Sequence, residues 1–451
     1  MRQIKVSVLI YVLNDISHIE KCIRSVMNQT LWEIEIIVID GGSADGTLQV
    51  INRMAELDPR ICVLHSLPGV GRQFNTGLKA AKGEYVGICE SDDYVLPDMY
   101  KDQYQICVRN HLDVLLADFN RFCEAGGKEF RVPFTVLKDK SLYGRVLFPQ
   151  EDDRPVEMGV NGYWSGLYRR DFLMEGNVFM NETKGASYQD TSIAFLSLVK
   201  AKRMMVSGKA YYCYRWDNLN SSVNSPRKIT ALTEEYTLLK KRLIEEGLFD
   251  RWKELYFLWK VNGLTWFYGR IQEEFREEYT EGICRELEKD WDSGVYKGSS
   301  LTCQEKTVID KIKKKELLEY FRMKDASLEN MRKKLKGIGQ NRKIIIFGSG
   351  NLGALVEFYM DYRGNKDLAY IDNKKELWGR EKNNIPILQP EKAAEYFPEA
   401  VYVVASTVHY DAMKEQLLQC GIDGGLVIVC PDYGFFLNHV LFNAMKEDEG
   451  W

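Results

Sequence analysis

The feature that most constrains the fold is a regular alternation of strand and helix patterns near the start of the chain. Apolar, β-branched runs typical of strands buried on both faces cover residues 5–10, 35–39, 62–64 and 85–88. Apolar residues at helical spacing fill the intervals and predict helices over residues 19–26, 48–54 and 70–81. Parallel strands need such crossover helices, so the pattern predicts an α/β fold with a doubly wound, mostly parallel sheet. In sheets of this kind, ligands bind beyond the carboxyl ends of the strands.

Three acidic residues, Glu90, Asp92 and Asp93, follow the fourth predicted strand. Close carboxylates repel one another and burial disfavours their charged form, so a divalent cation is a common way to offset the cost. Oxygen ligands suit Mg²⁺ or Mn²⁺. A solvated acidic turn is the alternative interpretation of the cluster taken alone. Asn14 and Asp40 also follow predicted strands, which lets them meet the acidic residues in one crevice.

The composition is that of a globular protein of several domains, with 451 residues, 45% of them hydrophobic and 28% charged. The net charge of −4 gives no sign of polyanion binding, so nucleic acid is not an expected partner. The ten cysteines form no CxxC pair, which argues against a zinc site. The chain shows neither a signal-peptide pattern nor an apolar run that would span a bilayer, so we expect a cytoplasmic protein with free thiols.

A series of motifs runs in order through residues 1–225. It comprises Val6–Ile10, Asn14, Ile37–Thr47, Asn75–Gly77, Lys82–Tyr85 and Ser91–Asp93. This series resembles the family 2 glycosyltransferases of the GT-A fold. The resemblance implies a catalytic domain over residues 1–225, a nucleotide-sugar donor and a metal ion, either Mn²⁺ or Mg²⁺. Gly41 stands where many members carry a second aspartate that contacts the nucleotide base, so the identity of the base stays open.

The resemblance also assigns roles on the donor side. It puts Asp93 on the metal and Asp92 on the metal or the ribose, whereas Glu90 has no assigned role. It places Asn14 and Asp40 against the nucleoside and Arg72 near the phosphates. Capping chemistry offers alternatives, namely a helix cap for Asn14 and a strand-end cap for Asp40. A surface arginine such as Arg72 is usually only solvated.

Downstream, Asp190 resembles the catalytic base of the family, which takes the proton of the acceptor hydroxyl as that oxygen attacks the anomeric carbon. The alternative is an N-terminal helix residue favoured by the helix dipole. Trp164 resembles an acceptor-site residue, although a core tryptophan is the more frequent case. Tyr214 and Arg215 are candidate diphosphate contacts, because the arginine fork matches phosphate, or else belong to an edge strand.

Residues 226–340 are predicted to form a helical extension that is rich in aromatic side chains and ends in a basic stretch. Lys and Arg outnumber Asp and Glu from Lys311 to Lys343. A basic amphipathic helix of this kind either contacts anionic lipid, which would put the protein on the inner face of the cell membrane, or serves as a solvated linker.

Residues 341–451 begin a new strand–helix pattern. Gly348, Gly350 and Gly353 form a GxGxxG motif between a predicted strand and a predicted helix, and Asp372 ends the next strand. The segment resembles small Rossmann-like modules attached to glycosyltransferases and sugar-modifying enzymes. The resemblance implies either a nucleotide or dinucleotide ligand or a purely structural module.

The leading hypothesis is a metal-dependent, inverting glycosyltransferase that moves a hexose-type sugar from a UDP-sugar to a hydroxyl of a surface glycan or lipid-linked acceptor. A non-catalytic scaffold that binds or senses nucleotide sugars is the second hypothesis, and Gly41 is its main support. A nucleotidyltransferase would need a glycine-rich, basic phosphate loop after the first strand. Residues Tyr11–Asp15 occupy that place and contain neither glycine nor lysine.

Overall fold

The computed structural model describes most of the chain, in two units. The described residues are 3–125, 128–137, 139–151, 162–183, 185, 188–218, 229–269, 271–294, 303–432, 440–441 and 444. The first unit comprises residues 1–123 and 133–317, and the second comprises residues 124–132 and 318–451. The acidic run at residues 152–153 falls outside the described residues.

The first unit is built on a mixed sheet. Its strands are β1 (Val6–Val12), β2 (Ile34–Asp40), β3 (Ile61–His65), β4 (Tyr85–Ile88), β5 (Tyr94–Val95), β6 (Val114–Ala125), β8 (Leu167–Arg169) and β9 (Met204–Arg215). The last two residues of β6 and most of β7 (Lys128–Phe134) are grouped with the second unit. The strand order is β3-β2-β1-β4-β8-β6-β9-β5, with β7 paired to β6. The four strands predicted first are parallel, whereas β8 runs antiparallel to both β4 and β6.

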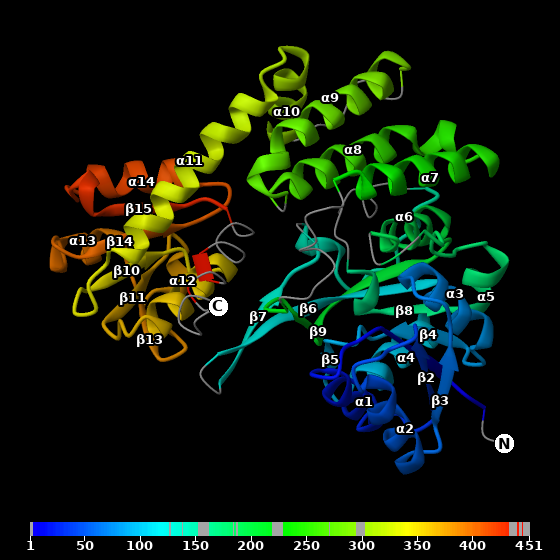
Figure 1. The fold of residues 1–451 in the computed structure, drawn as a ribbon. Helices are drawn as coiled ribbons and strands as arrows, with labels where there is room; N and C mark the ends of the chain where they lie inside the picture. The colour runs from blue at the N-terminus through cyan, green and yellow to red at the C-terminus, as the bar shows by residue number, and fades with distance from the viewer. Residues whose placement is uncertain are drawn as a thin grey trace. The chain divides into compact units, whose positions relative to one another are not determined.

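Helices flank this sheet (Figure 1). They are α1 (Ile19–Met27), α2 (Thr47–Leu57), α3 (Val70–Ala80), α4 (Met99–Asn110), α5 (Arg170–Glu175) and α6 (Asp190–Lys200). α1 packs beside α2, while α3 packs on β1 and β2. The central strands β1 and β4 are buried along their whole length, as their continuous apolar sequences predict.

The register of β1 and β4 determines what lies at the carboxyl end of the sheet. Leu9 pairs with Ile88, and β1 continues for another three residues to Val12, which pairs with Asp40. Glu90, two residues beyond Ile88, therefore lies level with Tyr11. The parallel register brings the ends of β1, β2 and β4 to one edge.

The helical segment expected after residue 226 is present in the first unit. It comprises α7 (Ala231–Glu245), α8 (Phe249–Tyr268), α9 (Arg276–Asp292) and α10 (Cys303–Lys313). Large aromatic side chains, including the buried Trp252 and Tyr256, fill the space between these helices. α7 also packs against α6, and Phe195 of α6 meets Trp259 of α8 edge-to-face at 5.2 Å.

The second unit contains a smaller sheet. Its strands are β10 (Ile344–Phe347), β11 (Leu368–Ile371), β12 (Glu381–Lys382), β13 (Ile385–Leu388), β14 (Val401–Ala405) and β15 (Val427–Cys430). They follow the order β12-β13-β11-β10-β14-β15, and every pair except β12–β13 is parallel. The helices are α11 (Leu317–Lys336), α12 (Asn351–Tyr362), α13 (Pro390–Tyr396) and α14 (Tyr410–Gln419).

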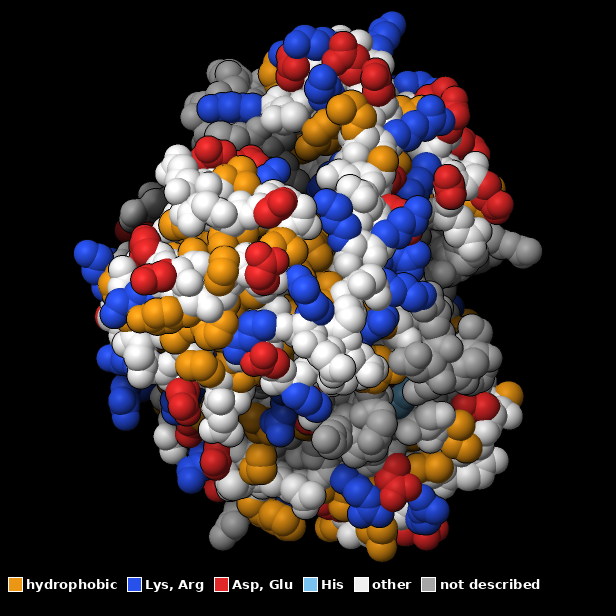
Figure 2. Space-filling model, turned by 90° about the vertical axis from the view of Figure 1, so that its left-hand side faces the viewer, with side chains coloured by type: hydrophobic (Ala, Val, Ile, Leu, Met, Phe, Trp, Pro, Cys, Tyr) orange, Lys and Arg blue, Asp and Glu red, His pale blue; other side chains and the backbone are white. Residues whose placement is uncertain are grey.

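The basic stretch predicted at the end of the helical extension lies largely on α11, which is grouped with the second unit from residue 318 onward. Its apolar residues Phe321, Leu328 and Leu335 are buried, so one side of the helix packs against protein. Figure 2 shows Lys and Arg side chains gathered in a column on one face of the molecule, with acidic side chains beside them. None of the helices in the described ranges combines the length and apolar character that a membrane span requires.

Candidate active site

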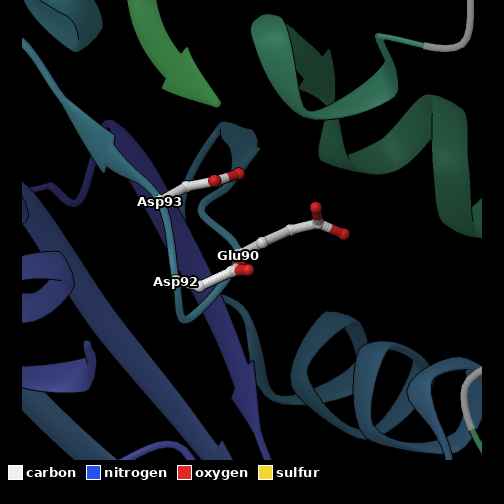
Figure 3. Close-up of side chains that lie close together, drawn as sticks. All are labelled: Glu90, Asp92 and Asp93. Atoms are coloured by element: carbon white, nitrogen blue, oxygen red, sulfur yellow. The ribbon is translucent and has the colours of Figure 1, made fainter. Parts of the chain in front are cut away.

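An acidic cluster, defined as Glu90, Asp92 and Asp93, occupies the turn between β4 and β5. One carboxylate oxygen from each residue lies within 4.8 Å of the others, and Figure 3 shows the three side chains on the same side of the turn. Asp93 is only 1% exposed. Three converging carboxylates form the donor set that hard divalent cations prefer.

Burial raises the pKa of each carboxyl in the acidic cluster. Burial and the charge of Asp92 raise the pKa of Glu90 to about 8. The pKa of Asp93 is raised well above its usual range by burial and by the charges of Asp92 and Glu90. Burial also raises the pKa of Asp92. The turn therefore concentrates negative charge that a cation would stabilise.

Two tyrosines hold Glu90. The hydroxyl of Tyr163 donates to Glu90 Oε1 at 2.7 Å, and that of Tyr11 donates to the same oxygen at 3.1 Å. The two hydroxyls also lie within hydrogen-bonding distance of each other, so their two protons are shared among these three contacts. Burial and then the charge of Glu90 raise the pKa of both phenols well above the usual range, so both remain donors. Sequence reasoning left Glu90 without a role and did not find these two partners.

The end of β9 fixes the two aspartates. The Tyr212 hydroxyl donates to Asp93 Oδ2 and the backbone N–H of Arg215 donates to Asp93 Oδ1, both at 2.6 Å. Asn218 Nδ2 donates to Asp92 Oδ2 at 2.7 Å. Each carboxylate oxygen has two lone pairs, so these hydrogen bonds leave capacity for a cation.

Arg215 and Tyr214 on β9, and Trp164 in the turn before β8, pack close to the acidic cluster. The Arg215 side chain is 6% exposed, pairs with Asp217 at 3.0 Å and donates from Nε to the Asp92 carbonyl at 3.1 Å. Trp164 is 5% exposed and stacks on Tyr212 and Tyr214, with ring centroids 4.3 and 5.1 Å apart. Trp164, Tyr214 and Arg215 thus form a packed wall behind the acidic cluster in this structure.

Asn14 and Asp40 organise the loops at the ends of β1 and β2. The buried Asp40 carboxylate accepts the backbone N–H groups of Gly42 and Ser43 at 3.0 and 3.2 Å. Asn14 has a left-handed φ of 54° and accepts the Ala44 N–H at 2.8 Å. The Asp40 carboxylate thus caps the end of β2, whereas Asn14 caps neither α1 nor α2 and instead joins the ends of β1 and the loop before α2. Both residues lie at the carboxyl edge of the sheet.

Asp15 and His18 connect α1 to the acidic cluster, and neither residue was assigned a functional role from the sequence. Asp15 accepts the Ser91 hydroxyl and His18 Nδ1, each at 2.6 Å. Ser91 lies inside the acidic turn, so these contacts hold the turn against the start of α1.

The glycine at position 41 has a structural explanation. Gln73 of α3 is 2% exposed and donates to the backbone carbonyls of Val12 and Ile39 at 2.8 and 2.9 Å. A Cβ atom added to Gly41 would lie 3.0 Å from Gln73 Nε2. An aspartate at position 41 would therefore require Gln73 to move.

The structure brings Asp190 to the acidic cluster. Asp190 is the first residue of α6, and its charge contributes to raising the pKa values of Glu90, Tyr11 and Tyr163. Arg72 of α3 is 40% exposed and its Nε lies 3.6 Å from Glu182, in the segment that leads to α6. Carboxylates from two distant segments thus share one region beyond the carboxyl ends of the strands.

The glycine motif of the second unit forms a tight strand–helix turn. Gly348 has a φ of +108°, and a Cβ on Gly353 would lie 2.0 Å from the Gly348 carbonyl oxygen. Asp372 accepts the backbone N–H and the hydroxyl of Ser349 at 2.9 and 2.7 Å. Lys382 donates to the carbonyls of Ser349 and Gly350, at 2.5 and 3.2 Å. Asp372 and Lys382 therefore fix the turn from both sides.

Comparison with known proteins identifies the segment that carries the acidic cluster. Residues 7–175 match the family model described as glycosyl transferase family 2. The acidic cluster lies inside this matched segment. Residues 340–428 match a second family model, described as C2185-like, N-terminal.

The chain is similar to proteins from several bacteria. The chain is 29% identical to the uncharacterized glycosyltransferase EpsJ of Bacillus subtilis over 49% of this chain and 64% of that protein. It is 32% identical to the putative glycosyltransferase EpsH of the same organism, over 37% of this chain and 48% of that protein. These matches span less than two thirds of either relative. The chain is 27% identical to the cholesterol galactosyltransferase of Borreliella burgdorferi, over 56% of this chain and 71% of that protein.

Among solved structures, the chain aligns with S. aureus TarS 1-349 in complex with UDP-GlcNAc. The identity is 18% and the TM-score 0.45, over 66% of this chain and 95% of that one. The mannosyltransferase PcManGT from Pyrobaculum calidifontis, in complex with GDP-Man and Mn²⁺, aligns with a TM-score of 0.38 and 12% identity, over 70% and 84% of the two chains.

Proposed function

We propose that the protein is a metal-dependent, inverting glycosyltransferase that transfers a hexose-type sugar from a UDP-sugar to a hydroxyl of a surface glycan or lipid-linked acceptor. The observation that carries the proposal is the acidic cluster, with Asp93 buried and Glu90 and Asp92 half-buried. It lies at the carboxyl edge of the sheet inside the segment that matches the glycosyl transferase family 2 model, with Asp190 close to it. The names of the relatives, which include a galactosyltransferase, support sugar transfer.

The residues of the acidic cluster fit a divalent cation. Their oxygens converge within 4.8 Å, and their raised pKa values report an uncompensated concentration of negative charge. Asp93 and Asp92 would hold Mn²⁺ or Mg²⁺, with Glu90 beside them. When bound, such an ion offsets the negative charge that develops on a departing diphosphate. Asn14, Asp40, Arg72, Tyr214 and Arg215 would contact the rest of the donor.

Asp190 would act as the general base. Its carboxylate takes the proton of the acceptor hydroxyl while that oxygen bonds to the anomeric carbon. The bond between this carbon and the diphosphate oxygen breaks on the opposite face, and its electron pair leaves with the nucleoside diphosphate. A single displacement of this kind inverts the anomeric centre. Trp164 would shape the acceptor side by holding the aromatic wall.

Binding without turnover is the second candidate function. It is favoured by the position of Gln73, which fills the space beside Gly41 where a base-contacting carboxylate would stand. Release of UDP from a UDP-sugar by the purified protein would exclude it.

For the remaining segments, we propose a catalytic domain over residues 1–225, a helical extension and basic linker over 226–340, and a Rossmann-like module over 341–451. Gly348, Gly350, Gly353 and Asp372 would form a nucleotide or dinucleotide site in that module. The protein would be cytoplasmic, with α11 the segment that could meet anionic lipid on the inner face of the membrane.

A thermal-shift screen of nucleotide sugars, with Mn²⁺ and with EDTA, tests the proposal. A UDP-sugar at about a hundred times its dissociation constant should raise the melting temperature by about 5 °C or more, because a ligand that binds only the native state stabilises it. We expect this shift in Mn²⁺ and its loss in EDTA. A shift that is equal in both buffers would contradict metal dependence, and no shift with any UDP-sugar would contradict the donor class.

A further inference from the structure

Glu235 of α7 is a buried carboxylate that holds the segment leading to Asp190. It is 2% exposed, although most glutamates lie at the surface. Its Oε2 accepts Asn181 Nδ2 at 2.8 Å and its Oε1 accepts the Thr183 hydroxyl at 2.6 Å. Burying a charged group is costly unless partners of this kind are present, so the arrangement needs an explanation.

The contacts continue from Thr183 to the start of α6. Thr183 Oγ1 accepts Gln189 Nε2 at 2.8 Å, and Gln189 is 1% exposed and directly precedes Asp190. The Ser192 hydroxyl donates to the Gln189 carbonyl at 2.8 Å and accepts the Asn181 N–H at 3.3 Å. Glu235 is thus connected by two short paths of hydrogen bonds to the first turn of α6.

The opposite side of this segment is fixed by α3. Asn75 Nδ2 donates to the Met180 carbonyl at 2.9 Å, and its Oδ1 accepts the Met180 N–H at 3.1 Å. A Cβ on Gly71 would lie only 1.9 Å from the Asn181 carbonyl oxygen. The segment therefore has a rigid support on the α3 side and depends on Glu235 on the α7 side.

We propose that Glu235 is a positioning residue that sets the place of the Asp190 carboxylate, so that α7 completes the active site. This inference rests on the proposed function, in which Asp190 acts as the base. The charge of Asp190 also acts on Glu235, where it adds to burial in raising the pKa of that carboxyl. Small displacements of a reacting group cost much of its rate, whereas donor binding at Asp92 and Asp93 would not depend on Glu235.

The test measures UDP release by the full chain with Mn²⁺ and water as acceptor. The donor is whichever of UDP-glucose, UDP-galactose and UDP-N-acetylglucosamine the wild type hydrolyses fastest. Glu235→Ala and Thr183→Val should each lower kcat by about tenfold or more while the KM for the donor changes less than about twofold. Glu235→Gln keeps an acceptor for Asn181 and should restore most of kcat. Glu234→Ala, on the exposed neighbour in the same helix, is the control and should match the wild type.

Thr183→Val keeps the test decisive if Glu235→Ala does not fold, because Thr183 lies in a partly exposed segment. In the Asp190→Asn background, Thr183→Val should cause no further loss, since two residues that act through one group are not additive. The positioning role of Glu235 would be overturned if Thr183→Val kept the wild-type kcat, or if it caused a full additional loss in the Asp190→Asn background. Either result would leave the proposed function standing. Absence of UDP release by the wild type would instead overturn the proposed function and this inference with it.

Discussion

Glu90 accepts hydrogen bonds from two phenols, so its partners differ from those of the other two members of the acidic cluster. Asp92 and Asp93 are held by β9 and the residues after it, whereas Glu90 is held by Tyr11 and Tyr163. Two donors on one carboxylate oxygen fix the orientation of the carboxylate. The second oxygen of Glu90, Oε2, is thereby held in a defined orientation.

Tyr163→Phe removes the shorter of these hydrogen bonds. Loss of a donor to a buried carboxylate should lower kcat for UDP release by about tenfold and the unfolding free energy by about 1–3 kcal/mol. Tyr104→Phe is a matched control, because it also removes a tyrosine–glutamate bond, of 2.8 Å to Glu84, at an exposed position. Equal activity of the two variants would show that the orientation of Glu90 does not matter.

The ionisation of Asp372 should make the stability of the second unit depend on pH. Burial alone would raise its pKa, but the hydrogen bonds from Ser349 and Lys374 lower it. A lowered pKa contributes stability that is present above the unfolded value of about 4 and is lost as pH falls through the folded value. Asp372→Asn should therefore cost about 1 kcal/mol at pH 7, the low end for a charged hydrogen bond at a partly exposed site.

The measurement is denaturant unfolding of wild type and Asp372→Asn from pH 8 to about pH 2.5. The difference should be constant above about pH 5 and shrink as the pH falls below about 4. Asp367→Asn, which loses a surface pair with Lys343, should change little at any of these pH values. A difference that grows as pH falls would contradict the sign of the shift.

At the scale of elements, the approach of α3 to the segment before α6 is set by Gly71. No side chain fits there, because its Cβ would meet the Asn181 carbonyl oxygen at 1.9 Å. The same helix supplies Gln73 beside Gly41 and Asn75 beside Met180. α3 thus contacts the ends of β1 and β2 through Gln73, and it contacts the segment that leads to Asp190 through Gly71 and Asn75 on another side of the helix.

Gly71→Ala should destabilise the protein by about 2 kcal/mol or more, because the new methyl group forces two backbones apart. Gly282→Ala is the control, since Gly282 lies inside α9 with no atom within 4 Å of an added Cβ. That change should instead stabilise by up to about 1 kcal/mol through helix propensity. Equal melting temperatures for the two variants would contradict the close contact between α3 and Asn181.

At the scale of the whole molecule, local patterns predicted the parallel strands well. β1, β2 and β4 are buried on both faces and so have nearly continuous apolar sequences. The antiparallel β5 and β8 are only two and three residues long, too short for a periodic signal. The mixed character of the sheet arises from these short strands, and so was not predicted.

For the candidate site, too, local sequence patterns predicted some features and missed others. The acidic cluster lies in one short stretch, and Asp190 could be placed through its motif. Tyr11 and Tyr163 are 152 residues apart, and Glu235 lies 52 residues beyond Thr183. Contacts between residues so far apart in the sequence depend on how helices and strands pack, so they cannot be predicted from local sequence patterns.

The central claim is that the acidic cluster binds the donor through a metal ion, and calorimetric titration of UDP tests it most directly. The wild type should bind UDP in Mn²⁺ and lose about a hundredfold or more in affinity in EDTA, because the ion would neutralise both the diphosphate and the carboxylates. Asp93→Asn should bind UDP weakly in both buffers, whereas Asp171→Asn, at an exposed position of α5, should behave like the wild type. Equal affinity of the wild type in Mn²⁺ and EDTA, or unchanged Mn²⁺-dependent binding by Asp93→Asn, would contradict the account.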